Sequence, residues 1–373
     1  MRISPLRVRV LIQKEMRQLF RDPKTKRIVF AAPIIQLLLF GYAVNTDVRN
    51  VSTVVVDQDR TTESRLLQEK LTASGYFRIV GAGDDPVYIE RALDGGSAVV
   101  GLQIPPGFAR DLKAGRSATA QVLIDGTNSN TATVAQGYAG RIIQEFAVDQ
   151  AASRGMKLEG GIDLRARAFY NPDLSSQVYN VPGVIGLLLV LMALLLTALA
   201  VVRERELGTL EQLMVSPISP EELILGKTVP VMIICLVDLA LITAVALLWF
   251  HIPLRGPVAA LVLASFVYIL AGLGAGLFIS AISRTQQEAF LTMFLFVLPG
   301  IILSGFMYPV ATMPEFFQHL TLLNPIRYFM EMVRGIFLKG QGVADLWSHY
   351  LILTGMAVFA ILGASNRFKK SLE

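Results

Sequence analysis

An uncharged apolar run near the middle of the chain limits what the whole protein can be. Residues 183–202 read GVIGLLLVLMALLLTALAVV and contain no charged side chain. A helix that crosses a bilayer needs about 20 predominantly apolar residues, because the hydrocarbon layer is about 30 Å thick and each helical residue rises about 1.5 Å. The run therefore predicts a transmembrane helix. The composition agrees, since only 17% of the 373 residues are charged, against roughly a quarter in soluble domains.

Five other segments have the composition of a span, which gives six expected transmembrane helices in all. The first of the six is the shortest and most polar, with Pro33 and Gln36 inside it. Trp347 and Tyr350 are placed as interfacial anchors of the last one. The approximate bounds of the five are 28–46, 229–250, 258–282, 289–307 and 347–365. We therefore expect a polytopic α-helical membrane protein, with residues 181–373 forming most of its transmembrane domain.

Basic residues at the two ends of the chain predict how the spans are oriented. Nine Lys or Arg residues precede the first span, against Glu15 and Asp22. The tail carries Arg367, Lys369 and Lys370. By the positive-inside rule both termini are expected in the cytoplasm, which an even number of spans permits. The net charge of +5 is thus a signal of topology and not of nucleic-acid binding.

The first 27 residues predict a helix at the cytoplasmic membrane surface. Apolar residues with helical spacing face one side, and basic residues fall on the other. The apolar set is Val8, Leu11, Ile12, Met16, Leu19 and Phe20, and the basic set is Arg7, Lys14, Arg17 and Arg21. A basic amphipathic helix of this kind lies flat on a bilayer. The alternative is a helix of a small soluble subdomain, which the nearby first span disfavours.

Residues 47–180 alternate strand and helix patterns and contain no span. Strands are expected at 51–56, 76–80, 98–104 and 118–124, and helices at 61–73, 85–94, 105–115 and 129–154. This alternation predicts a compact α/β domain inserted between the first and second spans. The orientation of the spans places that domain outside the cytoplasm.

Asp57 and Asp59 suggest a metal site, but two carboxylates at a strand end lack the remaining ligands for Ca²⁺ or Mg²⁺. A turn with a helix cap at Thr61 or Thr62 is the preferred interpretation. The domain contains no histidine or cysteine, so no nucleophilic catalytic set can be assembled in it. We expect no catalytic residue, no metal and no cofactor in this chain.

The predicted cytoplasmic loop 203–228 has the pattern of a docking helix. Leu207, Leu210, Leu213 and Met214 share one helical face, and Arg203, Glu204, Glu206 and Glu211 form its polar complement. Ser219-Pro220 then predicts the N-cap and start of a new helix. The alternative is a solvated connection between two spans, but the apolar stripe favours docking into another protein.

Gly226-Lys227-Thr228 resembles the end of a phosphate-binding loop and is rejected as one. The full pattern needs a glycine five positions before Gly226, where this chain has Glu221. The triplet also opens a transmembrane segment instead of following a strand. The energy for any active process must therefore come from a partner or from an ion gradient.

Asp238 is the acidic residue well inside a predicted span. A carboxylate within a membrane costs a few kcal/mol, so it usually faces the bundle interior or a wet cavity. Two interpretations stay open: a polar element of a substrate path or subunit interface, and a structural hydrogen bond. In the fourth span Gly272, Gly274 and Gly276 form a small-residue face suited to close helix packing.

Residues 308–342 follow the fifth span and are apolar, yet they contain prolines and charges. Pro314 and Asn324-Pro325 each start a short helix. In the second of these, Arg327, Glu331 and Arg334 have the i,i+4 and i,i+3 spacing of ion pairs. We expect re-entrant or interfacial elements that cover the bundle, not a seventh span.

These motifs resemble those of ABC type-2 transporter permeases. The stretch RERELGTLE at 203–211, with VSP at 215–217 and LGK at 225–227, is similar to the signature loop of that family. GFMYPV at 305–310, Met313-Pro314 and NPIRY at 324–328 are similar to its outer segment. The resemblance covers essentially the whole chain. It is closest to the bacterial subgroup with a large extracytoplasmic domain, associated with drug and xenobiotic efflux.

The resemblance implies an inner-membrane permease that exports a hydrophobic or amphipathic small molecule. Its partners would be a second permease, identical or paralogous, and separate cytoplasmic ATPase subunits. A periplasmic adaptor would be a further partner. ATP would be bound and hydrolysed by the partner, without a cofactor or enzymatic site in this chain. The ATPase-coupling helix would comprise Arg203, Glu204, Glu206, Gly208, Thr209, Leu210, Glu211 and Leu213.

Two other functions are weighed against export. A membrane-anchored extracytoplasmic binding or scaffold protein would explain the α/β domain, but not five further spans and a docking loop. An ion-driven secondary transporter would have several buried ionisable residues and repeated halves. One buried Asp and no visible internal repeat argue against that mechanism.

Overall fold

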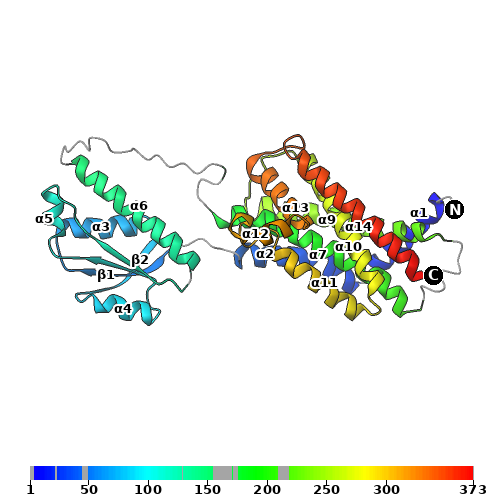
Figure 1. Ribbon diagram of the computed structural model, residues 1–373, viewed down its shortest axis with the longest axis horizontal. Coiled ribbons are helices and arrows are strands. Elements are labelled where there is room, and N and C mark those ends of the chain that lie inside the picture. The colour runs from blue at the N-terminus through cyan, green and yellow to red at the C-terminus, as the bar shows by residue number, and fades with distance from the viewer. Residues whose placement is uncertain are drawn as a thin grey trace. The chain divides into compact units, whose positions relative to one another are not determined.

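The computed structural model describes residues 4–21, 23–43, 49–127, 129–153, 170, 175–208 and 218–372. The chain divides into two compact units, one formed by residues 46–167 and the other by residues 1–45 together with 168–373 (Figure 1). The sequence predicted that the inserted domain ends at 180. The long helix that contains the uncharged run already begins at Ser176 and has Pro182 inside it, so residues 176–180 belong to the larger unit.

The smaller unit is a four-stranded sheet with helices on both faces (Figure 1). Its strands are β1 (Val51–Asp57), β2 (Phe77–Gly83), β3 (Val100–Ile104) and β4 (Gln121–Ile124), in the order β2-β1-β3-β4. β1 pairs in parallel with β2 and β3, and β4 runs antiparallel to β3. Both the strands and the intervening helices form in the order that the sequence predicts.

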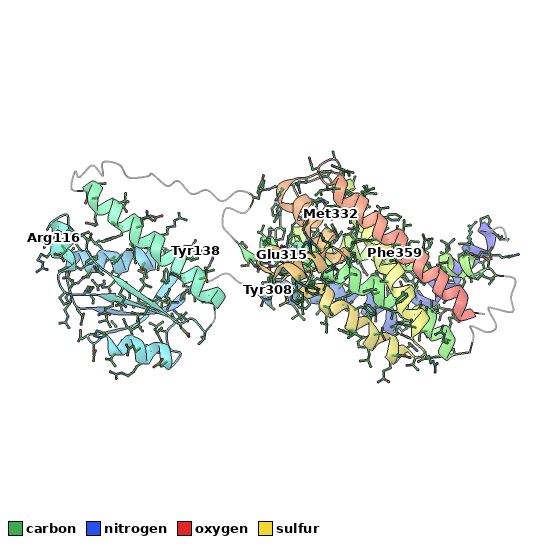
Figure 2. The ribbon with its side chains drawn as sticks, in the orientation of Figure 1. Arg116, Tyr138, Tyr308, Glu315, Met332 and Phe359 are labelled. Atoms are coloured by element: carbon green, nitrogen blue, oxygen red, sulfur yellow. The ribbon has the colours of Figure 1, made fainter. Side chains whose placement is uncertain are left out.

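The two faces of this sheet follow the period-two alternation of β1. Val55 packs with residues of α3 (Thr62–Ala73), α5 (Phe108–Lys113) and α6 (Ser129–Ser153). Val54 and Val56 pack with α4 (Val87–Asp94) on the opposite face. The rings of Tyr76 and Tyr138 stack with their centroids 3.7 Å apart, which fixes α6 next to the start of β2 (Figure 2).

Asp57 and Asp59 are both engaged at the end of β1 in turn and cap contacts. The Asp57 carboxylate accepts hydrogen bonds from side chains of α3, and Thr61 is the N-cap of that helix. The Asp59 carboxylate accepts hydrogen bonds from the backbone amides of Gly107 (2.7 Å) and Ala109 (2.9 Å) at the start of α5. Among the described residues, no group of three or more His, Cys, Asp or Glu could hold a metal ion.

The larger unit is helical, and four of its helices are long and apolar enough to cross a membrane. These four are α7 (Ser176–Glu206), α9 (Pro220–Leu248), α10 (Val258–Ile282) and α14 (Trp347–Leu372, apolar to 365). Two shorter apolar helices lie within α2 (Pro23–Ala43) and α11 (Gln286–Ile302). Apolar side chains on the outer face, such as the 80% exposed Phe359 of α14, fit a lipid-facing surface (Figure 2).

In the described part of this unit, α7 packs against α2, α9, α10, α11 and α13 and is a shared neighbour of these helices. A Cβ atom on Gly276 of α10 would lie 2.8 Å from the Thr197 Cβ of α7, and one on Gly274 would lie 2.8 Å from the Ala360 Cβ of α14. The close helix packing that was predicted for these glycines is therefore confirmed. Gly276 faces α7 and Gly274 faces α14, so the glycines contact two neighbouring helices instead of one.

The two expected anchors of the last span differ in their surroundings. Trp347 is 64% exposed at the start of α14. Tyr350 is buried, and its hydroxyl donates a 2.7 Å hydrogen bond to the carbonyl of Ala260. Tyr350 therefore joins α14 to α10 and is not an interfacial anchor, because its hydroxyl is bound to a backbone carbonyl inside the bundle.

Candidate functional site

The predicted coupling segment begins as a continuation of α7 and ends in the first turns of α9. α7 extends to Glu206, and Gly208 follows with a positive φ of 69°, a conformation that suits glycine. α9 begins after Ser219, whose side chain forms a capping box with Glu222, as the sequence predicts. Thr209, Leu210, Glu211 and Leu213 lie outside the described residues. The predicted loop 203–228 is thus helical at both ends.

Lys227 forms a buried ion-pair network at the junction of three helices. Its ammonium lies 3.0 Å from Glu15 Oε1 of α1 (Pro5–Arg21) and 3.3 Å from Glu204 Oε1 of α7. It also donates to the carbonyl of Ala200 at 3.1 Å. Lys14 Nζ lies 2.9 Å from the same Glu204 oxygen. The Lys227 side chain is only 3% exposed, so these partners replace its lost hydration.

The N-terminal half of α1 is fixed to the start of α9. The backbone amide of Ser4 donates a 2.7 Å hydrogen bond to Glu222, and the Arg7 guanidinium lies 3.6 Å from the same carboxylate. Leu11 is buried against Gly226, where an added Cβ would lie 2.6 Å from the Leu11 Cβ. α1 therefore packs against α9 of the same chain along one side. Its position on a membrane surface stays a prediction.

The last residues of α7 are bound to two more helices. The Arg205 guanidinium donates a 2.6 Å hydrogen bond to the carbonyl of Ser283, at the end of α10. The Glu206 carboxylate accepts a 2.7 Å hydrogen bond from the backbone amide of Gln286, where α11 begins. Three consecutive residues, 204–206, thus join α7 to α1 and α9, to α10 and to α11.

This arrangement changes which predicted residues can face a partner. Glu204 and Glu206 were predicted to contact another protein; the Glu204 side chain is buried in the network of Lys227, whereas Glu206 is exposed and its carboxylate also binds Gln286. Arg203 is exposed, and Leu207 is 64% exposed. Sequence reasoning used Lys227 only to exclude a phosphate loop. The position of Lys227 at the start of an apolar segment was the sequence signal that its charge is paired.

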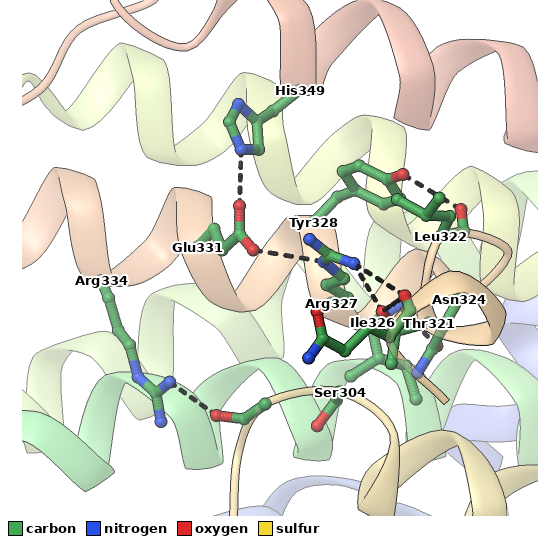
Figure 3. Close-up of polar contacts among 12 residues, drawn as sticks. Ser304, Thr321, Leu322, Asn324, Ile326, Arg327, Tyr328, Glu331, Arg334 and His349 are labelled. Atoms are coloured by element: carbon green, nitrogen blue, oxygen red, sulfur yellow. Dashed lines mark hydrogen bonds and ion pairs between the residues drawn. The ribbon is translucent and has the colours of Figure 1, made fainter. Parts of the chain in front are cut away.

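A second polar cluster connects the elements after α11 (Figure 3). These are α12 (Glu315–Thr321) and α13 (Pro325–Arg334). Asn324 caps α13, and its side-chain amide donates a 2.7 Å hydrogen bond to the carbonyl of Gly300. The predicted pair of Arg327 and Glu331 forms, with Nε 3.4 Å from Oε1, and the other Glu331 oxygen lies 2.8 Å from His349 Nε2 of α14.

The predicted ion pair of Glu331 and Arg334 does not form. The Arg334 guanidinium points to the opposite side from Glu331 (Figure 3). There it donates a 3.0 Å hydrogen bond to the carbonyl of Gly305 and lies 3.9 Å above the Tyr179 ring. Backbone acceptors and an aromatic face are more favourable here than an exposed pair. Arg334 therefore joins α13 to the N-terminal end of α7.

Asp238 is buried within the helices of this one chain, with 1% of its surface exposed. Among the described residues, neither of its carboxylate oxygens has a hydrogen-bond partner. Its burial within the chain disfavours the subunit-interface interpretation. The structural hydrogen bond is not seen either, so the sequence-based alternatives for Asp238 stay open.

Membrane-length helices packed on a shared central helix, with a charged junction at one end, define a polytopic helical membrane protein. The family described as "ABC-2 family transporter protein" matches residues 27–365. The chain belongs to this family and is a multi-pass membrane permease.

Three relatives from Escherichia coli strain K12 are similar over most of their lengths. The chain is 33% identical over 361 residues to "Probable multidrug ABC transporter permease YbhR", covering 95% of this chain and 98% of the relative. It is 32% identical over 361 residues to "Probable multidrug ABC transporter permease YbhS", covering 96% of each. "Inner membrane transport permease YhhJ" is 31% identical over 290 residues, 76% of each chain.

Proposed function

We propose that this chain is the membrane-spanning subunit of an ATP-driven exporter in the bacterial inner membrane. It pairs with a second permease, identical or paralogous, and separate cytoplasmic ATPase subunits supply the energy. The substrate is a hydrophobic or amphipathic small molecule. In this proposal the chain has six spans, with both termini in the cytoplasm and the α/β unit outside. Family membership and the names of the multidrug-permease relatives support this assignment.

The triple attachment of residues 204–206 is the observation that carries the coupling role. An ATPase that displaced the segment after Leu207 would pull on Glu204, Arg205 and Glu206 together. Their partners lie on α1 and α9, at the end of α10 and at the start of α11. Because the attachments are hydrogen bonds and ion pairs of defined geometry, a movement at this point reaches four helices at once.

The same junction supports the need for a separate ATPase. Gly226-Lys227-Thr228 lies inside α9 and not on a loop. The Lys227 ammonium has three N–H donors. The chain supplies three acceptors for them, on Glu15, Glu204 and Ala200. It is therefore not available to hold a phosphate.

The test uses the exposed apolar residue next to the attachments. Leu207→Asp is expected to abolish recovery of the ATPase subunit with the tagged permease, and with it dye-stimulated ATP hydrolysis in proteoliposomes. Leu66→Asp is the matched control, since Leu66 is a 41% exposed leucine of the α/β unit. ATPase recovery that is equal for the two variants would overturn the coupling role. Charge reversal at Glu204 or Glu206 is less decisive, because it also breaks internal contacts.

The alternative is a membrane-anchored protein whose α/β unit is the working part. Replacing residues 51–163 with a short Gly/Ser linker separates the two functions. An export permease keeps ATPase recovery after this deletion, because the described attachments at residues 204–206 lie in the other unit. Loss of every measurable activity would favour the anchored binding protein.

A further inference from the structure

A cavity of about 810 Å³ lies between α1, α7 and α9, beside the ion-pair network of Lys227. The C-terminal half of α1 forms one wall, which includes Arg17 and Arg21. The other walls come from the end of α7, including Arg203, and from the first turns of α9. The volume is within the range of sites that hold a ligand of a few hundred daltons.

The charge of this cavity is unbalanced in favour of the basic residues. Its two lysines, Lys14 and Lys227, are neutralised by Glu15 and Glu204 in the network described above. Three guanidinium groups then remain, on Arg17, Arg21 and Arg203. No carboxylate among the described residues forms an ion pair with any of them. Arg17, Arg21 and Arg203 are exposed arginines on the lining of one cavity, and such a set suits a phosphate group, which accepts paired hydrogen bonds from the planar guanidinium.

The inner part of the same cavity is apolar. Leu199 precedes Arg203 by four residues, which is about 6 Å along the helix axis. Val231 and Ile234 line the facing side and are buried. Both α7 and α9 are long and apolar enough to cross a membrane. A soluble anion would use only the cationic mouth, whereas a ligand with an anionic head and a hydrocarbon chain matches both parts.

We propose that this cavity binds an anionic phospholipid. Arg17, Arg21 and Arg203 hold its phosphodiester, and an acyl chain lies along Leu199 and Ile234. The lipid bridges α1 and α7 beside the predicted coupling segment. The proposal depends neither on the direction of transport nor on the ATPase, so its failure leaves the proposed function untouched.

Lipid binding is measured on the purified full chain, without an ATPase, by native mass spectrometry and by thermal shift in detergent. Short-chain phosphatidylglycerol is the test ligand. Phosphatidylcholine with the same chains tests for headgroup charge, and inorganic phosphate tests for the soluble source. Phosphatidylglycerol is expected to bind and to raise the Tm. Arg17→Gln and Arg21→Gln each weaken this binding by roughly tenfold, the effect of losing one charge-assisted hydrogen bond.

Arg9→Gln is the matched control, because Arg9 is an exposed arginine of the same helix that does not line the cavity. It removes the same charge from the same helix and is expected to bind phosphatidylglycerol as the unmodified chain does. Size-exclusion chromatography confirms that each variant is folded and monodisperse. Equal weakening by Arg9→Gln and Arg17→Gln overturns the proposal, as does equal binding of phosphatidylcholine. An equal shift with phosphate alone also overturns it, by assigning the site to a soluble anion.

Discussion

The ammonium of Lys227 lies 3.0 Å from the carboxylate of Glu15, although 212 residues separate the two in the chain. This contact joins the basic N-terminal helix α1 to the start of the membrane helix α9. Glu204 of α7 completes the group at 3.3 Å from the same ammonium. The end of the bundle that carries the predicted coupling segment is therefore held by charges that neutralise one another around the buried Lys227.

Lys227→Met is expected to destabilise the protein by about 3 kcal/mol, because it leaves Glu15 partly buried without its nearer cation. Differential scanning fluorimetry of the purified chain would show this as a fall in Tm of several degrees. The double variant Lys227→Met with Glu15→Gln removes both charges and should recover most of the loss. A double variant less stable than the single one would contradict this account of the network.

Gly226→Ala is expected to displace α1 from α9, since its Cβ would lie 2.6 Å from the Leu11 Cβ. Overpacking of this kind costs about 1–3 kcal/mol. The Tm should fall, and limited proteolysis should cut within α1 more rapidly. Gly355→Ala is the control, because an added Cβ at Gly355 meets nothing within 4 Å. Equal Tm values for the two variants would show that Leu11 does not pack against Gly226.

Asp59 gives α5 of the α/β unit a pH-dependent cap. Partial burial acts to raise the pKa of Asp59, but hydrogen bonds from Thr61, Ala109 and Gly107 outweigh it, and the pKa lies below its ordinary value of 3.8. The stabilisation is therefore complete at neutral pH and is lost as the pH falls from about 3.8 through the lowered pKa. Asp59→Ala should cost about 1 kcal/mol at neutral pH, the usual effect of removing a helix cap.

Hydrogen exchange by mass spectrometry on the full chain measures this cap through the amides of α5. Exchange should be faster in Asp59→Ala at pH 7, and the two proteins should converge in acid. Glu69→Ala on α3 is the control, because the Glu69 side chain forms no hydrogen bond or ion pair with α5 in the described part of the structure. A difference that persists unchanged into acid would show that the Asp59 charge does not provide the cap.

Asp238→Asn is expected to leave the Tm unchanged. Burial among apolar helices disfavours a charged carboxylate without partners, and asparagine keeps its shape without the charge. A fall of several degrees would mean that the charged carboxylate has a partner. At unchanged Tm, dye-stimulated ATP hydrolysis separates the two open interpretations: a loss assigns Asp238 to the substrate path, and full activity makes it structural.

The parts of the fold that sequence predicts here depend on local signals. The β-branched run at 51–56 gives β1, and Thr61, Ser219 and Asn324 mark helix starts because a cap is made within a few residues of itself. The length of the uncharged runs likewise predicts α7 and α10, since a helix that crosses a bilayer needs a long apolar segment.

The rest depends on contacts between residues that are far apart in the chain. No helical period indicates that Lys227 meets Glu15, or that Glu206 binds the start of α11. Arg334 shows the same limit on a single helix, because spacing predicts a pair with Glu331 whereas burial directs its guanidinium to Gly305. The local sequence pattern identifies the charged residues, but the packing of the helices determines which of them stay exposed.

The paired charges at the start of α9 also restrict how α1 can move. Sliding α1 by one helical turn, about 5.4 Å, would separate Glu15 from Lys227 and Lys14 from Glu204 at the same time. It would leave charges partly buried without an equivalent partner at the next turn. A position shifted by one turn is therefore higher in energy than the attached position. A conformational cycle that detaches this helix is therefore expected to break the two ion pairs together.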